Sequence, residues 1–171
     1  VNASMYHDLQ DGVLEIGFVS SLFPGRIGSN RVYFLTEGTN TWQVPSGITN
    51  IGIWCWGAGG GASSSYGGFT YVEAGVSPLE FLVVMVGQGG LAVTGSTTTA
   101  SYTDYALGGG GKGVSRTTTG AAGGGGGGSW VIRNTNDALA VAGGGGGGSG
   151  SANGGGGSGG DGTGGGGSSE G

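Results

Sequence analysis

The chain has 171 residues, of which 49 are glycine, and its formal net charge is −5. Only 9% of the residues are charged, whereas typical soluble domains have roughly 25%. Five Lys and Arg residues are too few for a basic patch, and the longest apolar run, residues 81–86, is too short to cross a bilayer. These counts exclude nucleic-acid binding through phosphate neutralisation and a helical membrane span.

The N-terminal part of the chain predicts extended strands. In residues 13–18, Leu14, Ile16 and Phe18 alternate with other residues and share one face. Further strands are expected at residues 31–35 and 41–44, before a stretch of turn-forming residues, Pro45-Ser46-Gly47.

Residues 48–56 carry the clearest alternation in the sequence. Ile51, Ile53 and Cys55 fall on one face, and two tryptophans fall on the other. Because both faces are apolar, we expect a central strand that is covered on both sides. Cys55 is the only cysteine, so we expect it to be a small buried hydrophobe.

The next segments predict two hairpins. Residues 69–76 and 79–86 are expected to pair as an antiparallel hairpin around Ser77-Pro78. The Thr-rich residues 94–105 fit either an edge strand or a loop. A last hairpin joins residues 130–132 to 138–141, and its large apolar side chains are expected to anchor it to the sheet: Trp130, Ile132, Leu139 and Val141. No window has helical periodicity, so the sequence predicts an all-β fold without α-helix.

Glycine is concentrated in runs, and 31 of the 49 glycines lie in residues 107–171. The middle runs adjoin strand candidates, which is not expected of a flexible linker. Glycine chains in the polyproline II conformation have three residues per turn and pack closely enough to hydrogen-bond sideways. We therefore expect a polyglycine II bundle beside a β-sandwich or jelly-roll-like body, with mobile glycine tracts as the alternative. The runs assigned to the bundle are 108–111, 123–128, 143–148, 154–157 and 164–167.

No motif predicts catalysis. Residues 57–62 match G-x-G-x-x-A after a strand, but no helical segment follows to hold a pyrophosphate. His7 is the only histidine, so no His/Cys cluster can bind zinc. We expect a protein that is not an enzyme, with no catalytic, cofactor-binding or metal-binding residues.

The segment from Thr41 to Gly61 resembles the start of the glycine-rich domain family. In that family a T-[FW]-x-V-P-x-G-[VI]-T turn leads into an alternating strand that ends in glycines, and residues 41–49 follow this pattern. Residues 138–148 are similar to the second glycine block of the family. The resemblance covers about residues 39–170 and implies a β-sandwich with polyglycine II helices and no enzymatic activity. Members occur in bacterial secreted proteins, phage tail-fibre tips and receptors of the anaplastic lymphoma kinase type.

Two regions follow from the limits of this resemblance. Residues 1–38 are expected to be an extended N-terminal segment, and residues 39–171 a glycine-rich domain. The first function hypothesis is a subunit of an extracellular filament, assembled head to tail by strand addition. Its subunit-contact candidates are Leu14, Ile16 and Phe18; pairing of these residues within their own chain is the alternative. Asn2 lies in an N-glycosylation sequon, and the start at Val1 fits a mature secreted product or a trimmed chain.

The second hypothesis is a receptor-binding adhesin at a phage tail-fibre tip. Its partner would be a cell-surface receptor or glycan, and its contact candidates are Tyr102, Tyr105 and Trp130, since aromatic residues are enriched at binding hot spots. A remote alternative is ice binding, suggested by the threonine triplets at residues 97–99 and 117–119.

Overall fold

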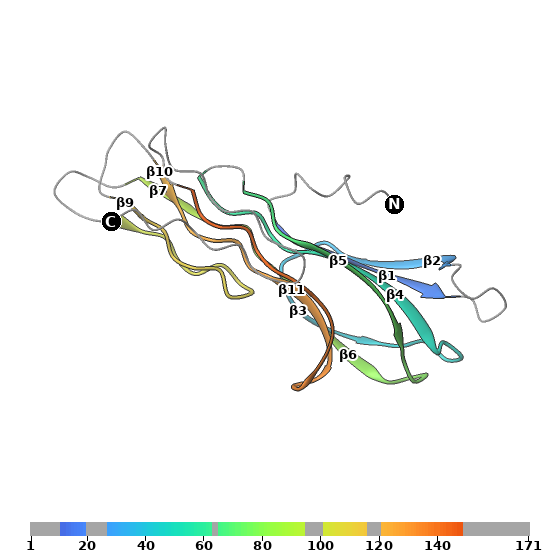
Figure 1. Cartoon of the computed structure of the whole chain (residues 1–171). Coiled ribbons are helices and arrows are strands. Elements are labelled where there is room, and N and C mark those ends of the chain that lie inside the picture. The colour runs from blue at the N-terminus through green and yellow to red at the C-terminus, as the bar shows by residue number, and fades with distance from the viewer. Residues whose placement is uncertain (1–10, 20–26, 63–64, 95–100, 116–120, 149–171) are drawn as a thin grey trace.

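The computed structural model describes residues 11–19, 27–62, 65–94, 101–115 and 121–148. Within these ranges the chain is all-β, as the sequence predicts: its regular elements are strands in antiparallel sheets, and there is no helix. Figure 1 shows larger sheets at one end of an elongated molecule, short strands at the other end, and undulating chain segments between them.

The first four-stranded sheet, called sheet A, has the order β2-β1-β4-β5. Its strands are β1 (Val13–Val19), β2 (Ile27–Phe34), β4 (Asn50–Trp56) and β5 (Phe69–Gly75). Strand β4 lies between β1 and β5, which confirms the predicted central position. Strands β1 and β2 belong to residues 1–38. The described part of that region therefore lies in the same sheet as β4 and β5.

The second four-stranded sheet, called sheet B, has the order β12-β11-β6-β3. Its strands are β3 (Gly38–Gln43), β6 (Phe81–Val86), β11 (Ser129–Asn134) and β12 (Asp137–Ala142). The predicted last hairpin is confirmed as β11 and β12.

The hairpin predicted around Ser77-Pro78 is wrong. Strand β5 pairs with β4 in sheet A, whereas β6 pairs with β3 and β11 in sheet B. The chain crosses between the sheets here, and the amide of Leu79 donates to the carbonyl of Val44 at 3.0 Å while Val44 donates to Glu80 at 2.9 Å. Strands β5 and β6 each have an apolar face that packs in the same core. The sequence pattern predicts this face, but it does not say whether the two strands pair with each other.

Both sheets contribute to one hydrophobic core. Leu14 and Ile16 from β1 are fully buried there, together with Val84 from β6 and Val131 from β11. The register places Trp130 and Ile132 on the opposite face of β11 from Val131, so the prediction that this pair anchors the hairpin is wrong. From β12, Ala140 and Ala142 belong to the core, and the predicted anchor Leu139 packs against it, whereas Val141 is exposed. The size of an apolar side chain therefore does not predict its burial unless it is known which face of the strand points to the core.

The short strands form two separate pairs at the end of the molecule away from sheets A and B, here called the far end (Figure 1). Strand β7 (Ala92–Thr94) pairs with β10 (Ala121–Gly123), and β8 (Ser101–Tyr102) pairs with β9 (Val114–Ser115). Of the Thr-rich residues 94–105, Thr94 ends β7 and two residues form β8; residues 95–100 lie outside the described part of the chain.

Candidate functional site: the glycine bundle and the far end

Glycine-rich segments connect the sheets to the far end. The central one is residues 123–128, and its six backbone amides donate to three different neighbouring segments in rotation. Gly123 and Gly126 donate to residues 143–148, Gly124 and Gly127 to residues 88–91, and Gly125 and Gly128 to residues 108–111, all at 2.8–2.9 Å. Every third amide therefore points to the same neighbour. We call these segments the glycine bundle.

A fourth neighbour, residues 57–61, closes the bundle on another side. Ala58 and Gly61 donate to Gly127 and Gly124 at 2.9 Å, again three residues apart. They also accept hydrogen bonds from Gly145 and Gly148, at 2.8 and 3.0 Å. The G-x-G-x-x-A match thus lies in a hydrogen-bonded segment of the bundle.

Side chains are excluded from the centre of the bundle by the distance between backbones. A Cβ atom added to Gly127 would lie 2.7 Å from the carbonyl carbon of Leu107, and one added to Gly124 would lie 2.6 Å from the carbonyl oxygen of Gly111. At Gly111, on the outside of the bundle, the same atom would meet nothing within 4 Å. The runs of glycine are thus a packing requirement at the centre and not at the edge.

The predicted and observed bundles differ in membership. Runs 108–111, 123–128 and 143–148 are hydrogen-bonded together in the structure, whereas 154–157 and 164–167 lie outside the described residues. The sequence-based assignment missed residues 57–61 and 88–91. A usable signal was present in both, because each glycine-containing stretch directly follows a strongly apolar strand.

The predicted subunit-contact residues lie inside the chain's own body. Leu14 and Ile16 are fully buried in the core, and Phe18 packs against it. The Phe18 ring stacks on Trp42, with ring centroids 6.4 Å apart. In the single chain these residues therefore pack within their own chain, which was the alternative. That they contact a neighbouring subunit by strand exchange stays a prediction.

The predicted surface-contact residues are not gathered into one site. Tyr102 belongs to β8 at the far end, where its backbone pairs with Val114; the structure describes its backbone and not its side chain. Tyr105 is 68% exposed, and the Lys112 ammonium lies 4.7 Å from its ring centre. Trp130 lies in sheet B opposite Met85 and is half-buried. Asn2, His7 and both threonine triplets are outside the described residues.

A buried ion pair lies on the outer face of sheet A. Glu15 is fully buried and pairs with Arg31, whose guanidinium carbon lies 5.0 Å from the centre of the Trp54 ring. The hydrogen bond to Glu15 raises the pKa of Arg31 above its usual value. Among the described residues, Glu15 Oε2 has no hydrogen-bond partner. The Arg31 guanidinium therefore balances the negative charge of the buried Glu15 carboxylate.

Cys55 is buried as expected, and its Sγ donates to the carbonyl of Ser129 at 3.1 Å. Burial raises the pKa of the thiol to about 12, from an ordinary value of 9.0. Since the nucleophilic form is the thiolate, this cysteine is an inert structural residue.

We predict that the stability of the protein depends on this thiol at alkaline pH. The unfolded chain releases the Cys55 proton near pH 9 and the folded chain only near pH 12. Stability from this group is therefore complete below pH 9 and falls by at most about 1.4 kcal/mol per pH unit above it. Urea unfolding between pH 8 and 10 should show this slope in the wild type and a smaller slope in Cys55→Ala; above pH 10, Tyr71, whose pKa burial raises to about 12, contributes equally to both proteins. Equal slopes in the two proteins would contradict the assignment.

The described residues contain no group of three His, Cys, Asp or Glu side chains placed to hold a metal ion. They also include no helix with the length and hydropathy of a membrane span. Comparison with protein-family models, with curated proteins and with known structures finds no match.

Proposed function

We propose that the segments of the glycine bundle are polyglycine II helices. Three residues per turn is the period of the polyproline II conformation, and it accounts for amides that address three neighbours in rotation. The absence of a Cβ at Gly124 and Gly127 allows the helices to approach closely enough for these bonds. We also propose that the chain is a member of the glycine-rich domain family that it resembles. Sheets A and B, which share one core, then correspond to the β-sandwich of that family.

We propose further that the protein is a non-enzymatic recognition protein whose glycine bundle holds the far end away from the sheets. The observation that carries this proposal is the hydrogen-bond repeat, because it couples the central segment, residues 123–128, to four neighbouring segments along its length. A far end held in this way loses little conformational entropy when it binds. The partner class is a cell-surface receptor or glycan, as for an adhesin at a phage tail-fibre tip, and the location is extracellular.

The far end offers apolar contact groups for such a partner. Val114 in β9 is 52% exposed, and Leu91, directly before β7, is 39% exposed. The described strand ends at Thr94, Ser101 and Ser115 also belong to this end. Connecting segments on a rigid framework are where binding residues concentrate.

Binding of the full chain to whole cells and to an array of cell-surface glycans tests this proposal. We expect Val114→Arg and Leu91→Glu to reduce binding at least about tenfold, because each change places an unpaired charge in an apolar contact. Tyr71→Glu, at an exposed position of sheet A, serves as the control and should bind like the wild type. Binding that is unaffected by both far-end changes would refute the proposal.

A filament subunit is the second candidate, favoured by the way in which β1 and β2 are attached. The covalent connection between these N-terminal strands and the following strands is short: residues 35–37, between β2 and β3. Exchange of the two strands between copies would preserve their core contacts and, repeated head to tail, would build a fibre. Electron microscopy of the native assembly distinguishes the candidates, because strand exchange requires long filaments whereas a recognition tip requires none.

A further inference from the structure

Residues 143–148 of the glycine bundle have one set of backbone amides without a partner. Gly145 and Gly148 donate to a neighbouring segment at 2.8 and 3.0 Å, and both are buried. Gly144 and Gly147 donate to none of the described residues, and both are half-buried. Because the bundle repeats every third residue, the Gly144 and Gly147 amides point to the same side of this segment. We call this segment the first wall.

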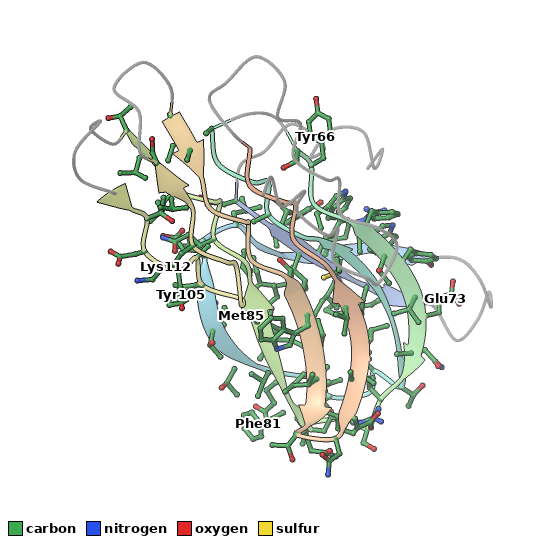
Figure 2. The ribbon with its side chains drawn as sticks, turned by 60° about the vertical axis from the view of Figure 1, so that its left-hand side comes forward. Tyr66, Glu73, Phe81, Met85, Tyr105 and Lys112 are labelled. Carbon is green, nitrogen blue, oxygen red and sulfur yellow. The ribbon has the colours of Figure 1, made fainter. Side chains whose placement is uncertain are left out.

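The loop around Tyr66 covers a different side of the first wall, because the Ser65 hydroxyl and the Gly68 amide donate to its carbonyls. Figure 2 shows Tyr66 on one side of the glycine bundle and Lys112 on the other. Lys112 directly follows residues 108–111, which we call the second wall. The loop therefore leaves uncovered the side of the bundle that the second wall bounds.

The central segment of the bundle lies between the two walls. A Cβ atom added to Gly125 would lie 3.3 Å from the Gly111 amide nitrogen on the second wall and 3.4 Å from the Gly145 carbonyl oxygen on the first. Gly125 is half-buried and Gly111 is exposed. The Gly111 amide, like the two on the first wall, donates to none of the described residues. We call this part of the bundle the open side.

The spacing of the amides specifies what can bind to the open side. Gly144 and Gly147 need two carbonyl oxygens that are three residues apart, which in the polyproline II conformation is about 9.3 Å. The chain that supplies them must lack side chains in order to approach as closely as the bundle segments approach one another. A Cβ atom on Gly144 itself would lie 2.5 Å from the Gly126 carbonyl carbon. Four consecutive glycines are the shortest run that meets both conditions.

The C-terminal part of the chain contains such a run. Residues 149–171 are outside the described residues and follow directly after the first wall, and residues 154–157 are four consecutive glycines. The five residues between the wall and this run can span up to about 16–18 Å, enough to reverse direction beside the wall. The wall runs toward the far end, where Gly148 accepts from Gly123 (Figure 1). A returning run is therefore antiparallel to it.

We propose that residues 154–157 bind to the open side as a further segment of the glycine bundle, antiparallel to residues 143–148. The first and last carbonyls of the run accept from Gly147 and Gly144. Successive carbonyls in a turn of three residues point in three directions, and the one that faces the second wall accepts from Gly111. The inference rests on the proposed polyglycine II geometry and does not depend on the proposed recognition function.

Amide hydrogen exchange, measured by NMR on the full chain, tests this placement. The variant carries Gly155→Val and Gly156→Val, whose side chains keep the run away from the walls. We expect its Gly144 and Gly147 amides to exchange at least about tenfold faster than those of the wild type, because each loses a hydrogen bond. Gly145 and Gly148, which donate within the described bundle, should stay protected in both proteins. Fast exchange at these two reference amides would contradict the bundle geometry itself.

Gly159→Val with Gly160→Val is the matched control, because it makes the same changes in the same tail outside the run. It should exchange like the wild type. Equal exchange of Gly144 and Gly147 in the wild type and the Gly155/Gly156 variant would overturn the proposal, and protection that leaves out Gly111 would overturn the position between the walls. Protection found only at concentrations where sedimentation velocity exceeds the chain mass of 16.3 kDa would assign the site to the tail of a second copy and overturn the intrachain placement.

Discussion

Gly127→Ala should destabilise the protein by about 3 kcal/mol or more, the upper range for overpacking a close-packed interior. The added Cβ would lie 2.7 Å from the Leu107 carbonyl carbon, so the two backbones must separate. Separation would weaken the bonds from Gly127 to the half-buried Gln88 at 2.8 Å and from the buried Ala58 to Gly127 at 2.9 Å. Each buried group left unpaired costs about 1–3 kcal/mol.

Gly111→Ala is the matched control, because it makes the same chemical change in the same bundle. Its Cβ would meet nothing within 4 Å, and the carbonyl that accepts from Gly125 is retained. Alanine also reduces the freedom of the unfolded chain, which stabilises by about 0.4–1 kcal/mol where the backbone conformation is compatible. Urea unfolding of the two variants should therefore give changes of opposite sign. Similar losses in both would mean that the bundle is not closely packed at Gly127.

Arg31→Met should destabilise the protein by about 3 kcal/mol at neutral pH, the lower range for breaking a buried ion pair. The change leaves the fully buried Glu15 carboxylate without its counter-charge and removes the cation from the Trp54 ring. Adding Glu15→Leu to this variant should recover most of the loss, because no buried charge then remains. The double-mutant cycle, measured by urea unfolding, gives the coupling between the two side chains.

Arg133→Met provides the comparison for this ion pair. Arg133 also contacts carboxylates, but the side chains of Glu80 and Asp137 are 18% and 42% exposed, so water screens them. Its loss should therefore cost at most about 1 kcal/mol. A larger effect at Arg133 than at Arg31 would contradict the importance assigned to the burial of Glu15.

The sequence predicted the strands better than their pairing. The alternation in residues 48–56 identified β4 and its central position, because a strand covered on both faces is apolar on both. The same kind of pattern failed at Ser77-Pro78, where β5 and β6 enter different sheets. At β11 it selected Trp130 and Ile132 for the core, whereas Val131 is the buried residue. Size and hydropathy alone do not say which face of a strand is the inner one.

The sequence by itself determined the all-β class and the existence of glycine segments beside the strands. Both properties are local, since alternation and the lack of side chains can be read from neighbouring residues. Tertiary structure decided which glycine segments touch. Residues 57–61 and 88–91 join the bundle because the ends of β4 and β6 direct them alongside residues 123–128. A glycine has no side chain whose size, charge or shape could indicate its neighbour, so the partners of each segment follow only from the way in which the sheets are assembled.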